Sequence, residues 1–151
     1  MNSKYRNILT IIGIIVFVFI LCPIGITYFS TNPYTKVINM NWKIELPNKD
    51  ANVVYSYSLP SPHGDGIRYH VIDYPNENNP ILDDVFCKSE KPTEKQIAHV
   101  RELLNNEEIE KDVFPEFDNC ELVYLKQDDY SELFLFYNRD TKTVYVVESF
   151  I

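Results

Sequence analysis

A long apolar run near the start of the chain constrains the fold more than any other feature. From Ile8 to Phe29 no side chain carries a charge at neutral pH. At about 1.5 Å per residue, a helix of this length matches a hydrocarbon core of about 30 Å. The run therefore predicts a single transmembrane helix over residues 8–29, inserted in the lipid bilayer.

The charges beside the run predict its orientation. Lys4 and Arg6 precede it, whereas Lys36 is the only basic residue that follows it closely. Since basic residues stay on the cytoplasmic side, residues 1–7 form a cytoplasmic tail and the rest of the chain lies outside the cell membrane, as in a single-pass bacterial protein.

A cleaved signal peptide is the competing interpretation, because it also begins with positive charge and an apolar stretch. The residues after the run offer no small-x-small cleavage site, and Gly25 and Thr27 make a poor one. A lipoprotein signal would need a small residue before Cys22, where this chain has Leu21. An uncleaved anchor fits these residues better.

The remainder has room for one domain. The chain has 151 residues, and a linker over residues 30–38 leaves residues 39–151 for an extracytoplasmic domain. The net charge is −8, and since Lys4 and Arg6 precede the apolar run, the domain itself is still more acidic. Such a surface repels phosphate backbones, so we expect no nucleic-acid binding. The whole chain has 45% hydrophobic and 14% aromatic residues, a composition too apolar for a disordered protein, so the domain should fold.

Alternating, β-branched and aromatic stretches predict strands on both sides of one helix. The helix spans Thr93–Asn105, where Thr93 and Gln96 fit a capping box and Ile97, Val100, Leu103 and Leu104 form one apolar stripe. A short helix is expected over Ile81–Cys87. The six predicted strands are Met40–Leu46, Asn52–Ser58, Ile67–Tyr74, Glu121–Gln127, Ser131–Tyr137 and Thr143–Phe150.

This pattern predicts an α+β domain with one antiparallel sheet, in the order β-β-β-α-β-β-β. Two strands are apolar at both their odd and their even positions, namely in Leu133–Tyr137 and Val144–Val147. Because alternate residues of a strand face opposite sides of a sheet, these strands should lie centrally with both faces covered. The main helix covers one face, and the other is covered by loops or left open as a binding surface.

The segment from Ser61 to His70 holds the candidate binding residues. Two glycines crowd into it, which indicates backbone with positive φ or a close approach. The plain interpretation is a tight connection between two strands. The polar side chains of the segment allow three further interpretations: a metal site, a catalytic histidine paired with a carboxylate, or a site that binds an anion. The candidates are His63, Gly64, Asp65, Gly66, Arg68 and His70, of which Arg68 and His70 share a strand face. His63, Asp65 and His70 would be the metal ligands, although their spacing matches no standard zinc pattern.

Cys87 and Cys120 are the cysteines outside the apolar run. Outside the cell they can form a disulfide if their Cα atoms come within about 7 Å, and they can equally remain buried thiols. His99 lies off the apolar stripe of the main helix and is expected at its solvated rim.

These residues carry no motif of a known family and indicate no cofactor. The leading hypothesis is a membrane-anchored interaction domain without enzymatic activity, which binds a protein or surface partner through tyrosines on a sheet face and the segment around His63 and His70. One alternative is a small metal-dependent or hydrolytic enzyme using His63, Asp65 and His70. Another is an immunity-type protein that protects the cell envelope.

Overall fold

The computed structural model describes residues 34–49, 51–59, 65–75 and 79–151. The chain divides into two units, Met1–Tyr34 and Thr35–Ile151, and the fold below is that of the second. The predicted transmembrane helix over residues 8–29 lies outside the described residues. Within them, no helix combines the length and apolarity needed to cross a bilayer.

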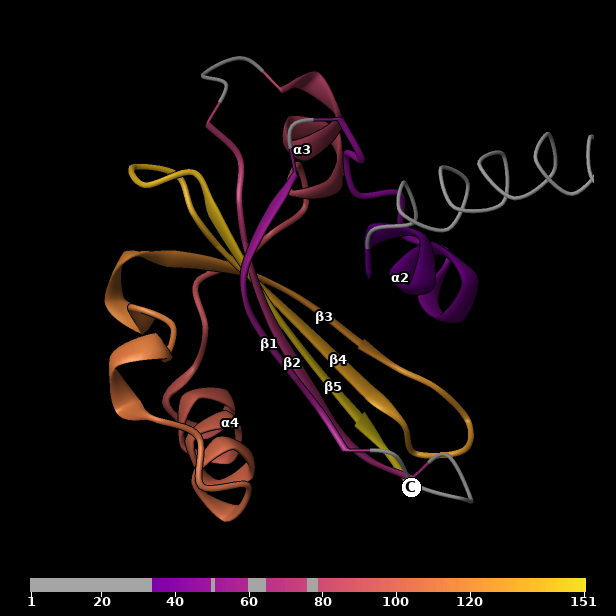
Figure 1. Ribbon diagram of the computed structural model, residues 1–151, viewed down its shortest axis with the longest axis vertical. Helices are drawn as coiled ribbons and strands as arrows, with labels where there is room; N and C mark the ends of the chain where they lie inside the picture. Colours follow the sequence, from indigo (N-terminus) through magenta and orange to yellow (C-terminus); the bar gives the residue numbers. More distant parts are fainter. Residues whose placement is uncertain (1–33, 50, 60–64, 76–78) are drawn as a thin grey trace, which may run out of the picture. The chain divides into compact units, whose positions relative to one another are not determined.

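One antiparallel sheet of five strands forms the centre of the fold (Figure 1). Its spatial order is β1-β2-β5-β4-β3. The strands are β1 (Asn52–Ser58), β2 (Gly66–Asp73), β3 (Cys120–Lys126), β4 (Glu132–Asn138) and β5 (Thr143–Phe150). Five of the six predicted strands are thereby confirmed, as is the α+β class.

The two strands with apolar residues on both faces, β4 and β5, lie inside the sheet, as predicted. β5 is the middle strand, and β4 separates it from the edge strand β3. Leu133, Leu135 and Val146 are fully buried on one face, and Phe134, Phe136 and Val147 on the other. Both faces are therefore core, and each needs a covering layer.

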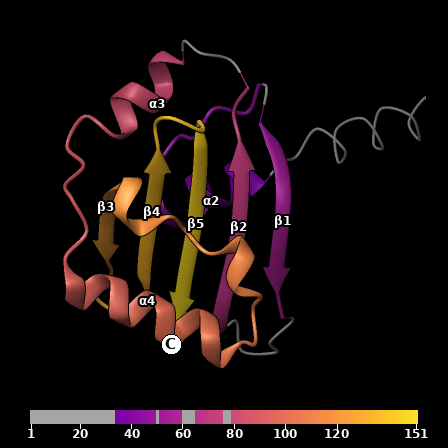
Figure 2. The ribbon, with the colours of Figure 1, turned by 90° about the vertical axis from the view of Figure 1, so that its left-hand side faces the viewer.

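Helix α4 (Glu94–Asn106) covers one face (Figure 2). It begins with the predicted capping box. The backbone N–H of Gln96 donates to Thr93 Oγ1 over 3.3 Å, and the backbone N–H of Thr93 donates to Gln96 Oε1 over 2.9 Å. Ile97, Val100 and Leu104 bury the predicted stripe against Tyr69, Phe134, Phe136 and Val147. Two short 3-10 helices, η1 (Lys111–Val113) and η2 (Phe117–Asn119), lead from α4 to β3.

Helices α2 (Tyr34–Trp42) and α3 (Pro80–Val85) lie on the other face. Figures 1 and 2 show α2 and α4 on opposite sides of the sheet. The short helix predicted from Ile81 is confirmed as α3, and Phe86 after it stacks on Tyr137 with ring centroids 4.8 Å apart. Helices thus cover this second face over its central strands, whereas Ser56 and Ser58 of edge strand β1, on the same face, are exposed.

The strand predicted over Met40–Leu46 is wrong. Thr35, Ile38 and Trp42 are buried at spacings of three and four residues, which is a helical period, whereas Met40 is 73% exposed. α2 ends at Trp42, and Lys43 follows with a φ of 59°. Of the residues predicted as a linker, 30–38, residues 34–38 are helical, and the second unit begins at Thr35; residues 30–33 lie outside the described residues.

Candidate functional site

The segment predicted as a binding site is described only in part. His63 and Gly64 lie outside the described residues, and Asp65 is exposed immediately before β2. Gly66 opens β2 with a φ of 119°, a conformation that side chains rarely adopt, so the positive φ expected of these glycines is confirmed at this one.

Arg68 and His70 share one face of β2, as predicted, but their side chains have different surroundings. The Arg68 guanidinium lies 4.6 Å from the centre of the Phe150 ring. His70 is only 6% exposed, and burial, together with the charge of Arg68, lowers its pKa to about 4. His70 is therefore uncharged at neutral pH. Within the described residues, no three His, Cys, Asp or Glu side chains are arranged to hold a metal ion.

The possible disulfide is not formed. Cys87 is exposed and Cys120 is buried, and both are free thiols. Cys120 belongs to the cluster under α4, whereas Phe86, next to Cys87, packs on Tyr137 at the opposite face of the sheet. The sheet thus separates the two cysteines. Burial raises the pKa of the Cys120 thiol to about 12, which keeps it protonated and unreactive.

Glu148 is a buried carboxylate that the sequence analysis missed. It lies on β5 directly opposite Arg68 and on the same sheet face as His70, and it has no exposed surface. Its Oε1 accepts hydrogen bonds from Trp42 Nε1 over 2.6 Å and from Asn41 Nδ2 over 3.2 Å. Among the described residues, Oε2 has no hydrogen-bond partner. Burial raises the pKa of Glu148 to about 8.

A groove of about 930 Å³ runs along the outer side of edge strand β3. Residues of β3, the segment after α2, helix α3 and the segment between α3 and α4 line it. Ile44, Val85 and Leu125 contribute apolar side chains. The charged lining residues are equally basic and acidic: Lys43, Lys88, Lys91, Glu45, Asp84 and Glu90.

The main chain of β3 is partly open along this groove. The Leu122 amide donates to the Glu90 carbonyl over 2.8 Å, and the Glu90 amide donates to the Leu122 carbonyl over 3.0 Å. Because outward-facing groups alternate along a strand, Tyr124 and Lys126 present their N–H and C=O groups to the same side. No described residue forms a backbone hydrogen bond with them there.

Side chains hold the ends of this edge in place. At one end, Glu132 accepts hydrogen bonds from Tyr124 (2.6 Å), His99 (3.0 Å) and Lys126 (3.2 Å). Burial acts to raise the pKa of Glu132, but these hydrogen bonds prevail and lower it. His99 is half-exposed at the edge of α4, as expected, and its contact with Glu132 ties α4 to the sheet.

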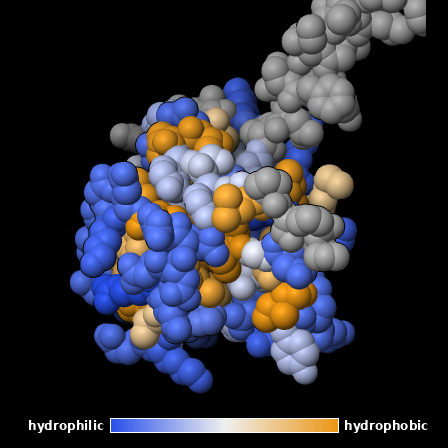
Figure 3. Space-filling model, turned by 60° about the horizontal axis from the view of Figure 1, so that its bottom comes forward, coloured by the Kyte–Doolittle hydropathy of each residue, from blue (hydrophilic) through white to orange (hydrophobic). Residues whose placement is uncertain are grey.

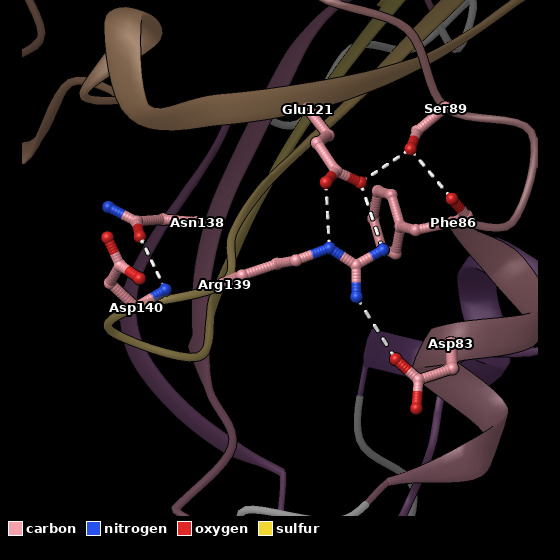
Figure 4. A network of polar contacts seen from close by, with 7 residues as sticks. All are labelled: Asp83, Phe86, Ser89, Glu121, Asn138, Arg139 and Asp140. Atoms are coloured by element: carbon pink, nitrogen blue, oxygen red, sulfur yellow. Dashed lines mark hydrogen bonds and ion pairs between the residues drawn. The ribbon is translucent and has the colours of Figure 1, made fainter.

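At the other end, Arg139 joins β3 to α3 (Figure 4). Its Nε and Nη2 donate to the two oxygens of Glu121 over 2.7 and 3.0 Å, and its Nη1 donates to Asp83 over 3.1 Å. The hydrogen bonds from Arg139 lower the pKa of Glu121. Since Asp83 belongs to α3, this arrangement fixes one wall of the groove relative to β3.

The groove offers open main-chain groups beside apolar side chains, an arrangement that can pair with an extended segment. Comparison of the chain with protein-family models, with curated proteins and with solved structures finds no match.

Proposed function

We propose that this protein is a binding module without enzymatic activity, tethered to a membrane through residues 8–29, which pairs an extended segment of a partner protein with edge strand β3. The observation that carries the proposal is the groove along β3, in which outward-facing main-chain groups lie beside apolar side chains. An extended peptide gains main-chain hydrogen bonds at such an edge and gains specificity from alternate side chains.

Glu90 indicates the direction of the added strand. Its bridge to Leu122 is antiparallel and occupies one position of the edge. A segment that continues along this line beside Tyr124 and Lys126 also runs antiparallel to β3. Its alternate side chains point toward Ile44, Val85 and Leu125, so the partner needs at least one apolar side chain there.

Charge supports an uncharged or mixed-charge partner segment. The whole chain has a net charge of −8, but the groove has three lysines and three acidic residues. A segment lying in the groove therefore avoids the repulsion that the rest of the acidic surface exerts on acidic peptides. The face shown in Figure 3 is largely hydrophilic, with apolar side chains in separate patches.

The tyrosines of the sheet do not all have the same surroundings. Tyr69 and Tyr137 are buried in the core, whereas Tyr124 on edge strand β3 is 38% exposed and lines the groove. The enzyme hypothesis gains no support from the described members of its set, since Asp65 is exposed and His70 is buried and uncharged at neutral pH.

Peptide binding to an edge-blocked variant tests the proposal. Extended peptides are selected from a random library on the full chain, and their affinity is then measured for Tyr124→Pro and Tyr124→Thr. Proline removes the outward amide at an edge position where sheets tolerate it. We expect Tyr124→Pro to weaken binding by roughly tenfold or more, because a main-chain hydrogen bond in the groove is lost.

Tyr124→Thr is the matched control. Both variants lose the hydrogen bond from the Tyr124 hydroxyl to Glu132, but threonine keeps the amide. Peptide binding should therefore survive in Tyr124→Thr. Equal binding to wild type and Tyr124→Pro, with thermal unfolding showing both folded, would contradict strand addition at β3.

A further inference from the structure

Helix α2 is held to the sheet around one buried carboxylate. Trp42 and Ile38 are 5% and 0% exposed, and the Trp42 ring lies 5.9 Å from that of Phe150. Trp42 Nε1 and Asn41 Nδ2 of the helix donate hydrogen bonds to Glu148 Oε1 on β5. The Gln127 side chain also donates to the Asn41 carbonyl over 2.9 Å.

We propose that the protonation state of Glu148 controls the attachment of α2 to the sheet. This inference does not depend on peptide binding at β3, which lies at the sheet edge. It rests on the full burial of Glu148, on its two hydrogen bonds from α2, and on the absence of a described partner for Oε2.

The neutral acid suits this site, whereas the carboxylate does not. When Glu148 is protonated, its carbonyl oxygen accepts from Trp42 and Asn41 and no charge is buried. When Glu148 loses the proton, a negative charge is buried with donors on one oxygen alone, which costs several kcal/mol unless water or a cation reaches it. Trp42 and Asn41 cover the carboxyl group, so water enters when the end of α2 moves away.

On β2 and β4, no described residue next to Glu148 forms an ion pair with it. On β2, His70 is uncharged at neutral pH, and the Arg68 guanidinium lies over the Phe150 ring. On β4, Leu133 faces Glu148 across the strand pair. α2 has one charged residue, Lys36, which lies five and six positions before Asn41 and Trp42 and so faces another side of the helix. Burial is accordingly the cause that raises the pKa of Glu148 to about 8.

Release of α2 would change the reach of the domain. α2 is the first described helix after the apolar run, and as a helix its nine residues span about 13 Å. The same residues span up to about 30 Å when extended. Because an isolated helix of nine residues is unstable in water, the released segment unfolds, and a rise in pH would then lengthen the connection between the predicted anchor and the sheet.

Fluorescence of Trp42 tests this inference, because Trp42 is the single tryptophan of the chain. The emission of the full chain in detergent micelles, and its quenching by acrylamide, are recorded from about pH 6 to about pH 9.5, across the range where a buried carboxyl group of this kind titrates. We expect the wild-type emission to shift to longer wavelength and the quenching to increase as the pH rises, with a midpoint near the pKa of Glu148. Circular dichroism should show the sheet intact throughout.

Glu148→Gln is the decisive variant, since the amide keeps the accepting oxygen but cannot ionise. Its Trp42 emission should stay at the wild-type position of low pH over the whole range. Glu132→Gln is the control, a carboxylate whose pKa is lowered, and it should keep the wild-type transition.

Two results would overturn the inference: a wild-type emission that does not change with pH, or an unchanged transition in Glu148→Gln. If Glu148→Gln does not fold, hydrogen exchange of the α2 amides in the wild type decides. Faster α2 exchange above the midpoint, beyond the ordinary rise of exchange with pH seen in α4, supports the proposal, and its absence contradicts it.

Discussion

Two glutamates of this protein show how surroundings decide the protonation of the same side chain. Glu148 has no exposed surface and two donors on one oxygen, so burial raises its pKa to about 8. Glu132 accepts from three donors at the edge of the sheet, and its pKa is lowered although burial opposes this. A carboxylate is stable where hydrogen bonds replace its lost hydration, and Glu148 lacks enough of them.

The raised pKa of Glu148 predicts how the free energy of unfolding depends on pH. The folded state holds this proton more tightly than the unfolded chain, so the stabilisation is complete below the ordinary pKa near 4.5 and is lost as the pH rises through about 8. Since each unit of pKa difference between the folded and unfolded states corresponds to about 1.4 kcal/mol, the free energy of unfolding should fall by on the order of several kcal/mol. Denaturant unfolding of wild type and Glu148→Gln at pH values across this window measures it.

Glu148→Gln should lose most of that dependence and be the more stable protein above about pH 8. Glu132→Gln should retain it, because the lowered pKa of Glu132 adds a dependence at acidic pH instead. Parallel curves for wild type and Glu148→Gln would show that Glu148 ionises freely in the folded protein.

At the level of single elements, helices α2 and α4 differ in how clearly the sequence marks them. α4 has Pro92 and Thr93 before it, a capping box, and an apolar stripe with a helical period. α2 has no cap signal in its described residues, and Met40, Trp42, Ile44 and Leu46 alternate as in a strand. The burial of Thr35, Ile38 and Trp42 against the sheet selects the helix, which is a tertiary effect.

The capping box of α4 predicts a measurable loss of stability. Thr93→Ala removes the oxygen that accepts from the Gln96 amide, and the free energy of unfolding should fall by about 1 kcal/mol. Thr93→Ser keeps that acceptor and should stay close to wild type. Urea unfolding of the three proteins makes the comparison, and equal midpoints for Thr93→Ala and wild type would show that the cap contributes nothing.

On the scale of the whole molecule, the proposed tether would matter as much as the groove. A domain confined to a membrane meets partners at a high effective concentration, so a short edge such as that beside Tyr124 can suffice for binding. The proposal therefore depends on residues 8–29 remaining in the bilayer.

Membrane extraction tests the tether. The full chain should stay in the membrane fraction after an alkaline carbonate wash. Ile15→Arg with Phe19→Arg should release it, because each arginine at the centre of a span costs about 3 kcal/mol. Ile15→Leu with Phe19→Leu is the control and should remain bound. The exposed Lys95 should react with reagents added outside the cell, and labelling from the cytosol alone would reverse the predicted orientation.

The sequence by itself determined those parts of the fold that local patterns encode. β1 to β5, α3 and α4 follow from periodicity, turn residues and caps, and the central place of β4 and β5 follows from their two apolar faces. Long-range packing decided the rest. α2 became helical on the sheet, Cys87 and Cys120 were separated by it, and Glu148 was buried under Trp42. The groove on β3 is formed by segments distant in the chain, so no local pattern could predict it.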